Sequence, residues 1–381
     1  MEKEARKKRF RLEATRLAPG AGATDQVCHL QALLARYGFL GPYAPGEYDE
    51  ATRIGVAQFQ SFYRIYPDQD GVCDEETISL LNQPRCGVPD PPAGGRRADG
   101  TLAPYVTVGA KWPSTALRFR FLNSSPDLPE ARQRDIIREA FQRWSRESAL
   151  VFQEVAANQS SELSVGFYRG SHGDGSSFDD GGGADGNTLA HAFFPPPQGG
   201  TWAGSLHFDE FERWKDQPGG TGIRLYNVSL HEIGHLLGLS HSQDQNAIMY
   251  AYYGEDRNDL RPDDIAGVQS LYGAPAAAPV AISPGERVSG YLPQTGAELR
   301  YQVTLQNKLL VKLEGPAGQD FDLYLRHNQP AGTADGQYDA VSYGMTADEL
   351  VTINDPKPGT YYILVHSYRG TGSYTLEVEV V

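Results

Sequence analysis

One eleven-residue stretch carries the side chains best suited to chemistry: His231-Glu232-Ile233-Gly234-His235-Leu236-Leu237-Gly238-Leu239-Ser240-His241. On a helix, His231 and His235 share a face, so both imidazoles can reach one metal ion. Glu232 is not needed as a ligand, and its carboxylate can act as general base on a metal-bound water. Gly238 can end the helix, because glycine adopts left-handed backbone, and the returning chain brings His241. Three neutral imidazoles with a fourth position open to water predict a catalytic zinc site.

A methionine follows the last histidine by eight residues, in Asn246-Ala247-Ile248-Met249-Tyr250. Alone, Met249 would be an ordinary core residue, but after this histidine motif it is interpreted as a Met-turn beneath the metal. The two motifs together resemble the metzincin metallopeptidases, and further residues narrow the resemblance to the matrixins, the matrix metalloproteinase family. The resemblance implies a zinc endopeptidase in which Glu232 activates the attacking water and returns its proton to the leaving amine.

A cysteine segment, Pro84-Arg85-Cys86-Gly87-Val88-Pro89-Asp90, resembles the matrixin cysteine switch. The resemblance implies that the Cys86 thiolate occupies the catalytic zinc in a zymogen, while Arg85 and Asp90 hold the segment in place. Residues 91–104 follow as an expected activation linker, rich at first in proline, glycine and charge. We expect an activating cleavage there, because exposed linkers of this composition are preferred sites of proteolysis.

A second metal constellation lies between the cysteine segment and the histidine motif. The resemblance implies a closed structural zinc site with three nitrogen ligands and one oxygen ligand, made by His172, Asp174, His191 and His207. Each of these histidines alone would be an ordinary surface or core residue. The resemblance also implies calcium, which requires six to eight oxygen ligands. The expected calcium ligands are the carboxylates of Asp179, Asp209 and Glu212 and the backbone oxygens of Asp180 and Thr188.

The specificity pocket is only partly visible in the sequence. In matrixins the residue four positions before the first zinc histidine helps to set the depth of the pocket, and here it is Asn227. The wall segment after the Met-turn includes Tyr253. We expect the pocket to accept an apolar side chain on the carboxyl side of the scissile bond.

The pattern of apolar residues predicts a multidomain chain: a small all-α prodomain over 26–90, an α/β catalytic domain with a mixed twisted sheet over 105–273, and an all-β sandwich over 281–381. Residues 1–25 are predicted to be a basic tail and 274–280 an Ala/Pro linker. The three prodomain helices should bury Leu30, Leu33, Leu34 and Tyr37, then Ile54, Ala57 and Phe59, then Ile78, Leu80 and Leu81.

Both flanking regions carry resemblances of their own. Leu30-Gln31-x-x-Leu34, Phe59-Gln60 and Asp70-Gly71-Val72 resemble the peptidoglycan-binding-like domain, which implies bacterial wall glycan as a candidate partner. Asp320-Phe321-Asp322-Leu323-Tyr324-Leu325 and Pro358-Gly359-Thr360-Tyr361-Tyr362 resemble the bacterial pre-peptidase C-terminal domain and point to a secreted bacterial enzyme. Cys28 and Cys73 fall in the helical region, where a disulfide or two small buried side chains are both plausible.

Charge and length restrict the other classes of function. The net charge is −14, and residues 1–20 are basic, so the rest of the chain carries a net charge near −18. This acidic balance argues against nucleic acid as a partner. No run of 18 apolar residues predicts a membrane span, and no signal peptide is visible, although the resemblance implies an extracellular enzyme. We expect a monomer acting on a protein or peptide substrate. The alternatives are a wall- or matrix-binding protein with an inert centre, and a hydrolase of peptidoglycan peptides; an intact Glu232 argues against the inert centre.

Overall fold

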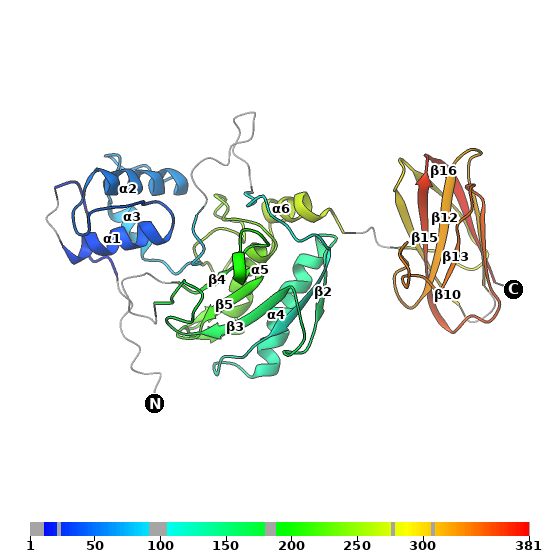
Figure 1. The fold of residues 1–381 in the computed structure, drawn as a ribbon, viewed down its shortest axis with the longest axis horizontal. Coiled ribbons are helices and arrows are strands. Elements are labelled where there is room, and N and C mark those ends of the chain that lie inside the picture. The colour runs from blue at the N-terminus through cyan, green and yellow to red at the C-terminus, as the bar shows by residue number, and fades with distance from the viewer. Residues whose placement is uncertain are drawn as a thin grey trace. The chain divides into compact units, whose positions relative to one another are not determined.

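The computed structural model describes residues 11–20, 24–90, 105–179, 188–275, 279–305 and 309–380. The chain is divided into two compact units, Met1–Pro275 and Ala276–Val381 (Figure 1). The first unit contains a helical region, residues 11–90, and an α/β region, residues 105–275; the second is built of strands. The described residues therefore have the multidomain all-α, α/β and all-β composition that the sequence predicts.

The helical region consists of α1 (Asp25–Arg36), α2 (Glu50–Tyr63) and α3 (Glu75–Leu81). Each helix starts at a residue whose side-chain oxygen accepts a hydrogen bond from the backbone N–H three residues later. These N-caps, Thr24, Asp49 and Asp74, satisfy amide groups that the first turn leaves free. The inner face of α2 differs from the predicted one: Ile54 is 43% exposed and Ala57 is half-buried, whereas Val56 and Phe59 are buried. The predicted face was wrong because it was chosen by hydropathy alone, whereas the helix also turns Gly55 and Thr52 inward.

The expected basic tail over 1–25 is wrong for its described residues, and the two alternatives for Cys28 and Cys73 can now be distinguished. Leu12 and Leu17 lie in its core, and Leu17 pairs with Cys73 through two backbone hydrogen bonds of 2.9 Å, so the described part of the basic tail belongs to the fold. The ten residues before Arg11 lie outside the described residues. All three cysteines are free thiols: Cys28 is exposed on α1, whereas Cys73 is fully buried, and no disulfide joins them.

The α/β region is organised on a five-stranded sheet of order β2-β1-β3-β5-β4. Strands β1, β2, β3 and β5 are parallel, and the edge strand β4 is antiparallel to β5. The elements are β1 (Ala116–Phe121), α4 (Glu130–Arg146), β2 (Val151–Glu154), β3 (Leu163–Tyr168), β4 (Ala190–Ala192), η1 (Gly200–Trp202), β5 (Ser205–Asp209), β6 (Trp214–Lys215), β7 (Ile223–Arg224), α5 (Leu225–Leu236) and α6 (Pro262–Tyr272).

Helix α4 holds α5 in place through a buried tryptophan. The predicted inner face of α4, which includes Ile136, Ile137 and Trp144, is buried, and the Trp144 indole N–H donates a 2.9 Å hydrogen bond to Leu230 O. A buried indole needs such an acceptor, because an unpaired N–H in the core is costly. The backbone of α5, which carries the histidine motif, is therefore tied to the main core.

The second unit is a sandwich of two antiparallel sheets, of order β13-β12-β15-β10-β8 and β14-β11-β16-β9, apart from the parallel β8–β10 pair. Its strands are β8 (Val280–Ala281), β9 (Arg287–Leu292), β10 (Glu298–Leu305), β11 (Leu309–Glu314), β12 (Asp320–His327), β13 (Ala340–Ser342), β14 (Glu349–Ile353), β15 (Gly359–Arg369) and β16 (Gly372–Val380). Strand β8 starts at Val280, so the sandwich begins inside the segment predicted as linker. None of the described helices is both long and apolar enough to cross a membrane.

Candidate metal centre

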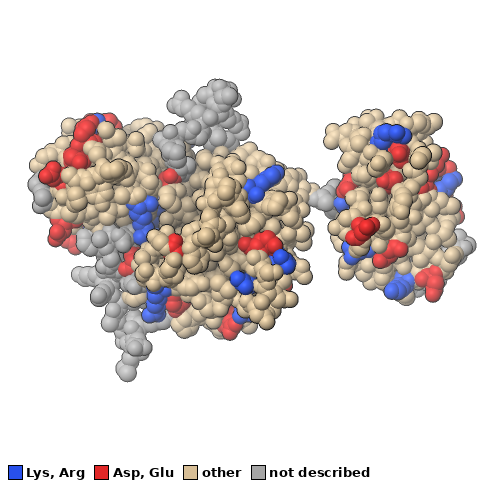
Figure 2. All heavy atoms as spheres, in the orientation of Figure 1, with Lys and Arg blue, Asp and Glu red and all other residues tan. Residues whose placement is uncertain are grey.

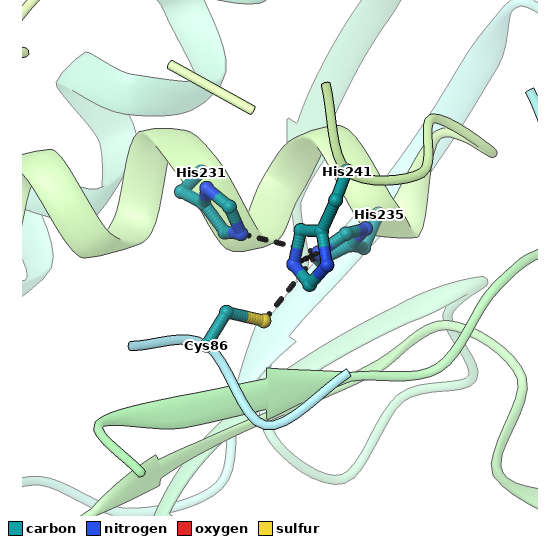
Figure 3. Close-up of side chains that lie close together, drawn as sticks. All are labelled: Cys86, His231, His235 and His241. Carbon is teal, nitrogen blue, oxygen red and sulfur yellow. Dashed lines mark hydrogen bonds between the residues drawn. The ribbon is translucent and has the colours of Figure 1, made fainter. Parts of the chain in front are cut away.

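Helix α5 and the turn after it bring the three motif histidines together. His235 Nε2 lies 3.2 Å from His231 Nε2 and 3.2 Å from His241 Nε2 (Figure 3). A fourth group joins them from the helical region, since Cys86 Sγ is 3.4 Å from His235 Nε2. These four ligand atoms all lie within 4.8 Å of one another and are buried.

The spacing fits a tetrahedral zinc ion. Zn–N bonds of about 2.0–2.1 Å imply N···N separations of about 3.3–3.4 Å, and a Zn–S bond of about 2.3 Å implies a slightly longer N···S separation. The observed 3.2 Å and 3.4 Å separations are close to these values. The donor set, three imidazoles and a thiol, is one that zinc prefers.

Each imidazole is oriented by a hydrogen bond on its other nitrogen. His231 Nδ1–H donates to Ile248 O, His235 Nδ1–H to Leu239 O and His241 Nδ1–H to Asp90 Oδ1, each at 2.7 Å. Oxygen acceptors of this kind fix the proton on Nδ1, so the Nε2 lone pairs point to the common centre. Burial lowers the pKa of all three imidazoles below the usual 6.5, which keeps them neutral as metal ligands must be.

Glu232 is fully buried beside this centre and shares a pocket wall with Cys86. Burial raises the pKa of the Glu232 carboxyl to about 8. A carboxyl with a raised pKa can both accept and return a proton near neutral pH, which is what a general base that later acts as acid requires.

The predicted Met-turn supports α5 from below. Met249 is buried, and a Cβ at Gly234 would lie 2.3 Å from its Sδ. The turn is itself fixed by Asp264, whose carboxylate accepts hydrogen bonds of 2.9 Å and 3.0 Å from the amides of Ile248 and Met249. Any larger residue at 234 would force the Met249 side chain to shift, a contact that the sequence motif alone did not explain.

The cysteine segment, residues 84–90, lies between two parts of the α/β region, beside the histidine centre. Its backbone pairs on one side with β4 and the residue before it, through Leu189 N to Arg85 O at 2.9 Å and Gly87 N to Ala190 O at 2.8 Å. On the other side Cys86 N donates to Ala251 O at 2.9 Å. A Cβ at Gly87 would approach Thr188 Cγ2 to 2.6 Å, so a larger residue there would force Thr188 or the cysteine segment to shift.

Arg85 anchors this segment as a buried cation. Its Nη1 is 2.9 Å from Asp90 Oδ2, and neither side chain is exposed. The guanidinium also donates to the backbone oxygens of Cys86 and Val88, and its Cζ lies 3.8 Å from the ring centroid of Tyr37. Burial opposes ionisation of Asp90, but Arg85 and His241 outweigh it and hold the pKa of this carboxyl below its usual value.

A tyrosine cluster around Arg85 was missed by sequence reasoning. Tyr63 OH donates to Asp90 Oδ2 at 2.8 Å, and its ring packs edge-on against Tyr252 and Tyr250. The sequence indicated Tyr37 only as a helix residue and left Tyr63 unmarked. No sequence motif links these tyrosines to Arg85, because their contacts form only when the helical region packs against residues 250–252.

The second predicted metal constellation also comes together. Asp174 Oδ2 lies 2.6 Å from His191 Nε2, 2.8 Å from His207 Nδ1 and 2.8 Å from His172 Nε2. Burial lowers the pKa of His191, and that of His207 to about 4, so both rings are neutral. A cluster of three histidines and one carboxylate has the donor set of a structural zinc site.

The predicted calcium residues are placed in part. Asp179, Asp209 and Glu212 are buried, and Thr188 is fully buried next to the cysteine segment. Asp180 lies outside the described residues. Within the described part of the chain, the three carboxylates do not gather as closely as the two histidine clusters, so this ligand set stays a prediction.

Asn227 and Tyr253 line one pocket beside the histidines, and their role in specificity stays a prediction. Its other lining residues include Leu189, Val228, Ile248, Tyr250 and Arg257. Asn227 Nδ2 donates to Gly254 O and Glu255 O at 3.2 Å and 3.0 Å, so this side chain ties α5 to the loop that closes the pocket. The pocket offers about 30 Å³, little more than a water, while Cys86 forms part of its wall.

Comparison with known proteins identifies the class to which this centre belongs. Residues 111–273 match the family Matrixin, residues 298–367 match the bacterial pre-peptidase C-terminal domain, and residues 23–81 match a peptidoglycan binding domain. The histidine centre lies in the first of these segments. Residues 111–273 thus belong to the matrixins, zinc metalloendopeptidases that use zinc and calcium.

Named relatives of the chain are metalloproteinases from animals and bacteria. Matrix metalloproteinase-16 of Mus musculus is 35% identical over 270 residues, which are 67% of this chain and 43% of that protein. Karilysin of Tannerella forsythia is 44% identical over 173 residues, 45% of this chain and 35% of karilysin. The interstitial collagenase of Equus caballus is 40% identical over 228 residues, 59% of this chain and 44% of that protein. The chain thus spans less than half the length of these relatives.

Proposed function

We propose that this protein is a zinc-dependent endopeptidase made as a latent zymogen. The observation that supports this most directly is the position of Cys86, whose thiol lies 3.4 Å from His235 Nε2 at the point where three imidazoles converge. His231, His235 and His241 would hold the catalytic zinc, and Cys86 would be its fourth ligand before activation. Burial raises the pKa of the Cys86 thiol, but a thiol that coordinates a metal ion is deprotonated, because the metal stabilises the thiolate.

Catalysis follows from the residues around the centre. When bound, zinc would polarise the peptide carbonyl as a Lewis acid and lower the pKa of a bound water. Glu232 takes the proton of the attacking water and delivers it to the leaving amine. The substrate backbone would pair with Ala190 and Leu189 at the sheet edge and with Ala251 on the opposite wall, because the cysteine segment uses these same groups in the latent chain.

The preference of the enzyme is proposed to be for an apolar side chain after the scissile bond. The pocket beside His231 is lined by Leu189, Val228 and Ile248, with Tyr253 on its wall. Asn227 supports the loop that closes it. The apolar side chains on this wall favour an apolar occupant, since a polar group buried against them without a partner is costly.

The remaining site residues have structural roles in this proposal. His172, Asp174, His191 and His207 would hold the structural zinc. The calcium ligands would be Asp179, Asp180, Thr188, Asp209 and Glu212. The domains would be a helical prodomain over 26–90 that residues 11–20 extend, a catalytic domain over 105–273 and a sandwich over 281–381, with the activating cleavage in 91–104.

The setting of the enzyme is proposed to be extracellular. The match of 23–81 to a peptidoglycan binding domain supports bacterial wall glycan as a partner of the helical region. This observation also favours a second candidate function, hydrolysis of the peptides of peptidoglycan. An activating protease would act on the zymogen, and we propose that the chain works as a monomer.

The proposal is tested by measuring three variants on a quenched peptide, two of them uncleaved and the third after cleavage of the linker. Cys86→Ala should be active before any cleavage, because the fourth zinc position is then open to water. Cys28→Ala is the matched control, since its exposed thiol has no role in latency. Glu232→Ala should retain zinc and lose about 10²–10⁴-fold in activity even after the linker is cut. An inactive Cys86→Ala chain that carries its full zinc content would refute the switch.

A further inference from the structure

Asp90 uses its two carboxylate oxygens for different purposes. Oδ2 accepts from Arg85 Nη1 at 2.9 Å and from Tyr63 OH at 2.8 Å, whereas Oδ1 accepts from His241 Nδ1 at 2.7 Å. The side chains of Asp90 and His241 are both completely inaccessible to solvent. The Asp90–His241 contact joins residues 151 positions apart in the chain.

The three motif histidines differ in what orients them. His231 and His235 donate to the backbone oxygens of Ile248 and Leu239, which belong to the α/β region itself. His241 donates instead to a carboxylate from the cysteine segment. When that segment leaves, His231 and His235 keep their acceptors and His241 loses the one that the structure shows.

We propose that Asp90 is a positioning residue for the catalytic zinc, so that the latent chain holds this metal more tightly than the cleaved enzyme does. The inference rests on the proposed function, because it takes His241 as a zinc ligand. In this arrangement the cysteine segment contributes a ligand through Cys86 and a second, indirect contact with the metal through Asp90 and His241.

A carboxylate acceptor strengthens a metal-bound imidazole in two ways. It fixes the ring orientation and the tautomer, and its charge raises the basicity of the ligand more than a neutral carbonyl does. Loss of such outer partners costs about 10–100-fold in metal affinity in other zinc sites. The release of the segment would therefore weaken the site through His241 as well as through the lost thiolate.

The carboxylate of Asp90 is held for this contact by groups other than His241. The Asp90 backbone N–H donates to Tyr37 O at 3.0 Å, and a Cβ at Gly38 would lie 3.2 Å from Asp90 O. Arg85 fixes the opposite oxygen. Because the carboxylate is already placed, the hydrogen bond to His241 needs no further ordering of the side chain.

The test measures zinc retention and segment docking in the same molecule. All variants are full-length chains that carry Glu232→Ala, which prevents self-cleavage, and Cys28→Ser, which removes the exposed thiol. Transfer of zinc to excess 4-(2-pyridylazo)resorcinol gives the rate of metal loss, and alkylation of Cys86 by iodoacetamide gives the rate at which the segment opens. The zinc of the second cluster, bound by His191 and its neighbours, serves as an internal reference.

Two substitutions separate direct from indirect effects. Arg85→Ala calibrates how much zinc loss accelerates when the segment merely opens more often. Asp90→Asn should accelerate zinc loss about 10–100-fold beyond that expected from its own rate of Cys86 alkylation. Asp74→Asn is the matched control, because asparagine replaces aspartate well at an N-cap and this residue lies in the same helical region.

A spectroscopic measurement tests the contact itself. With ¹⁵N-histidine labelling, the nine histidines give few signals, and the Nδ1–H proton of His241 should resonate far downfield. Asp90→Asn should move this signal, and Asp74→Asn should leave it in place. A purely structural role for Asp90 would not change a histidine signal in chains whose segment remains docked.

The outcomes distinguish this inference from the proposed function. Arg85→Ala gives the ratio between the acceleration of zinc loss and the acceleration of Cys86 alkylation. If Asp90→Asn shows the same ratio, Asp90 serves docking alone and the inference is overturned. An unchanged His241 signal would overturn it as well. If metal analysis finds no zinc at the three motif histidines in the parent chain, the proposed function itself fails.

Discussion

Replacing Arg85 by alanine should open the latent state without touching a proposed zinc ligand. Arg85 is the largest charged side chain that is fully buried among the described residues. It forms an ion pair with Asp90 in which neither side chain is exposed. The substitution leaves the Asp90 carboxylate buried and without its cation. The cysteine segment in its docked form would then carry an uncompensated charge, whereas the undocked segment could hydrate it.

The magnitude follows from the burial of the pair. Breaking a buried ion pair by removing one partner costs about 3–5 kcal/mol. At about 1.4 kcal/mol per tenfold change, the open-to-docked ratio of the segment should rise by about 10²–10⁴. The contact of Arg85 with the Tyr37 ring is part of the same loss and is not added separately, because neighbouring interactions are not additive.

The assay is the alkylation rate of Cys86 in the Cys28→Ser, Glu232→Ala background. Arg53→Ala is the matched control on the same helical region, because its ion pairs with Glu50 and Asp70 are solvent-exposed and worth at most about 1 kcal/mol. The buried thiol of Cys73 reports whether the helical region itself unfolds, since it should remain unreactive.

Two results would contradict this reasoning. Alkylation of Cys86 in Arg85→Ala within about threefold of the parent would mean that the ion pair contributes nothing to docking. Rapid alkylation of Cys73 together with Cys86 would mean that the substitution unfolds the helical region. In that case Arg85→Met, which keeps most of the side-chain volume against the tyrosines, repeats the test.

Three further predictions concern the α/β region. Gly234→Ala should destabilise the fold by about 1–3 kcal/mol by overpacking against the Met249 sulfur; thermal unfolding measures this, and an unchanged Tm would contradict it. His191→Ala should reduce the zinc content from two ions per chain to one and lower the Tm, which metal analysis and calorimetry check. Burial raises the pKa of the Asp263 carboxyl to about 6 in the folded chain, from 3.8 in the unfolded chain. The folded state is therefore most stable while Asp263 is protonated, and its stability decreases as the pH rises from about 4 to 6. At pH 7.5 the free energy of unfolding of Asp263→Asn should exceed that of the parent by up to about 3 kcal/mol, and at pH 4 the two should not differ in this way.

The histidine motif was predictable because its chemistry is local. His231 and His235 are brought together by one helix, and His241 by the turn that follows it, so sequence spacing sets the geometry. The four residues of the second cluster come from separate strands and loops, and no spacing rule places them. Their grouping was predicted through family resemblance, and the distances of 2.6–2.8 Å around Asp174 agree with it.

The inner face of α2 and the cysteines show where sequence patterns fail. Ile54 fits a helical stripe by hydropathy, yet the helix buries Thr52 and Gly55 because buried polar partners and close backbone contact determine its rotation. Gln31 donates to Thr52 Oγ1 at 2.8 Å, a contact that apolar periodicity does not register. Cys28 is exposed on α1 and Cys73 is buried before α3, and both are free thiols, so the presence of two cysteines in one small helical region does not imply a disulfide.

The structure gives the cysteine segment two anchors, and this explains why thiol chemistry and cleavage need not be equivalent. One anchor is the Cys86 thiol at the histidine centre, and the other is Arg85 with its buried ion pair and its backbone contacts. Removing the thiol leaves the second anchor, so a Cys86→Ala chain would still place its backbone on Ala190 and Ala251 for part of the time. Cleavage between the segment and the α/β region removes the covalent tether, and the local concentration that it maintains is lost. If the proposed latency is correct, we expect full activity only after the cut, whereas loss of the Cys86 thiol alone should give an enzyme that is partly inhibited by its own cysteine segment.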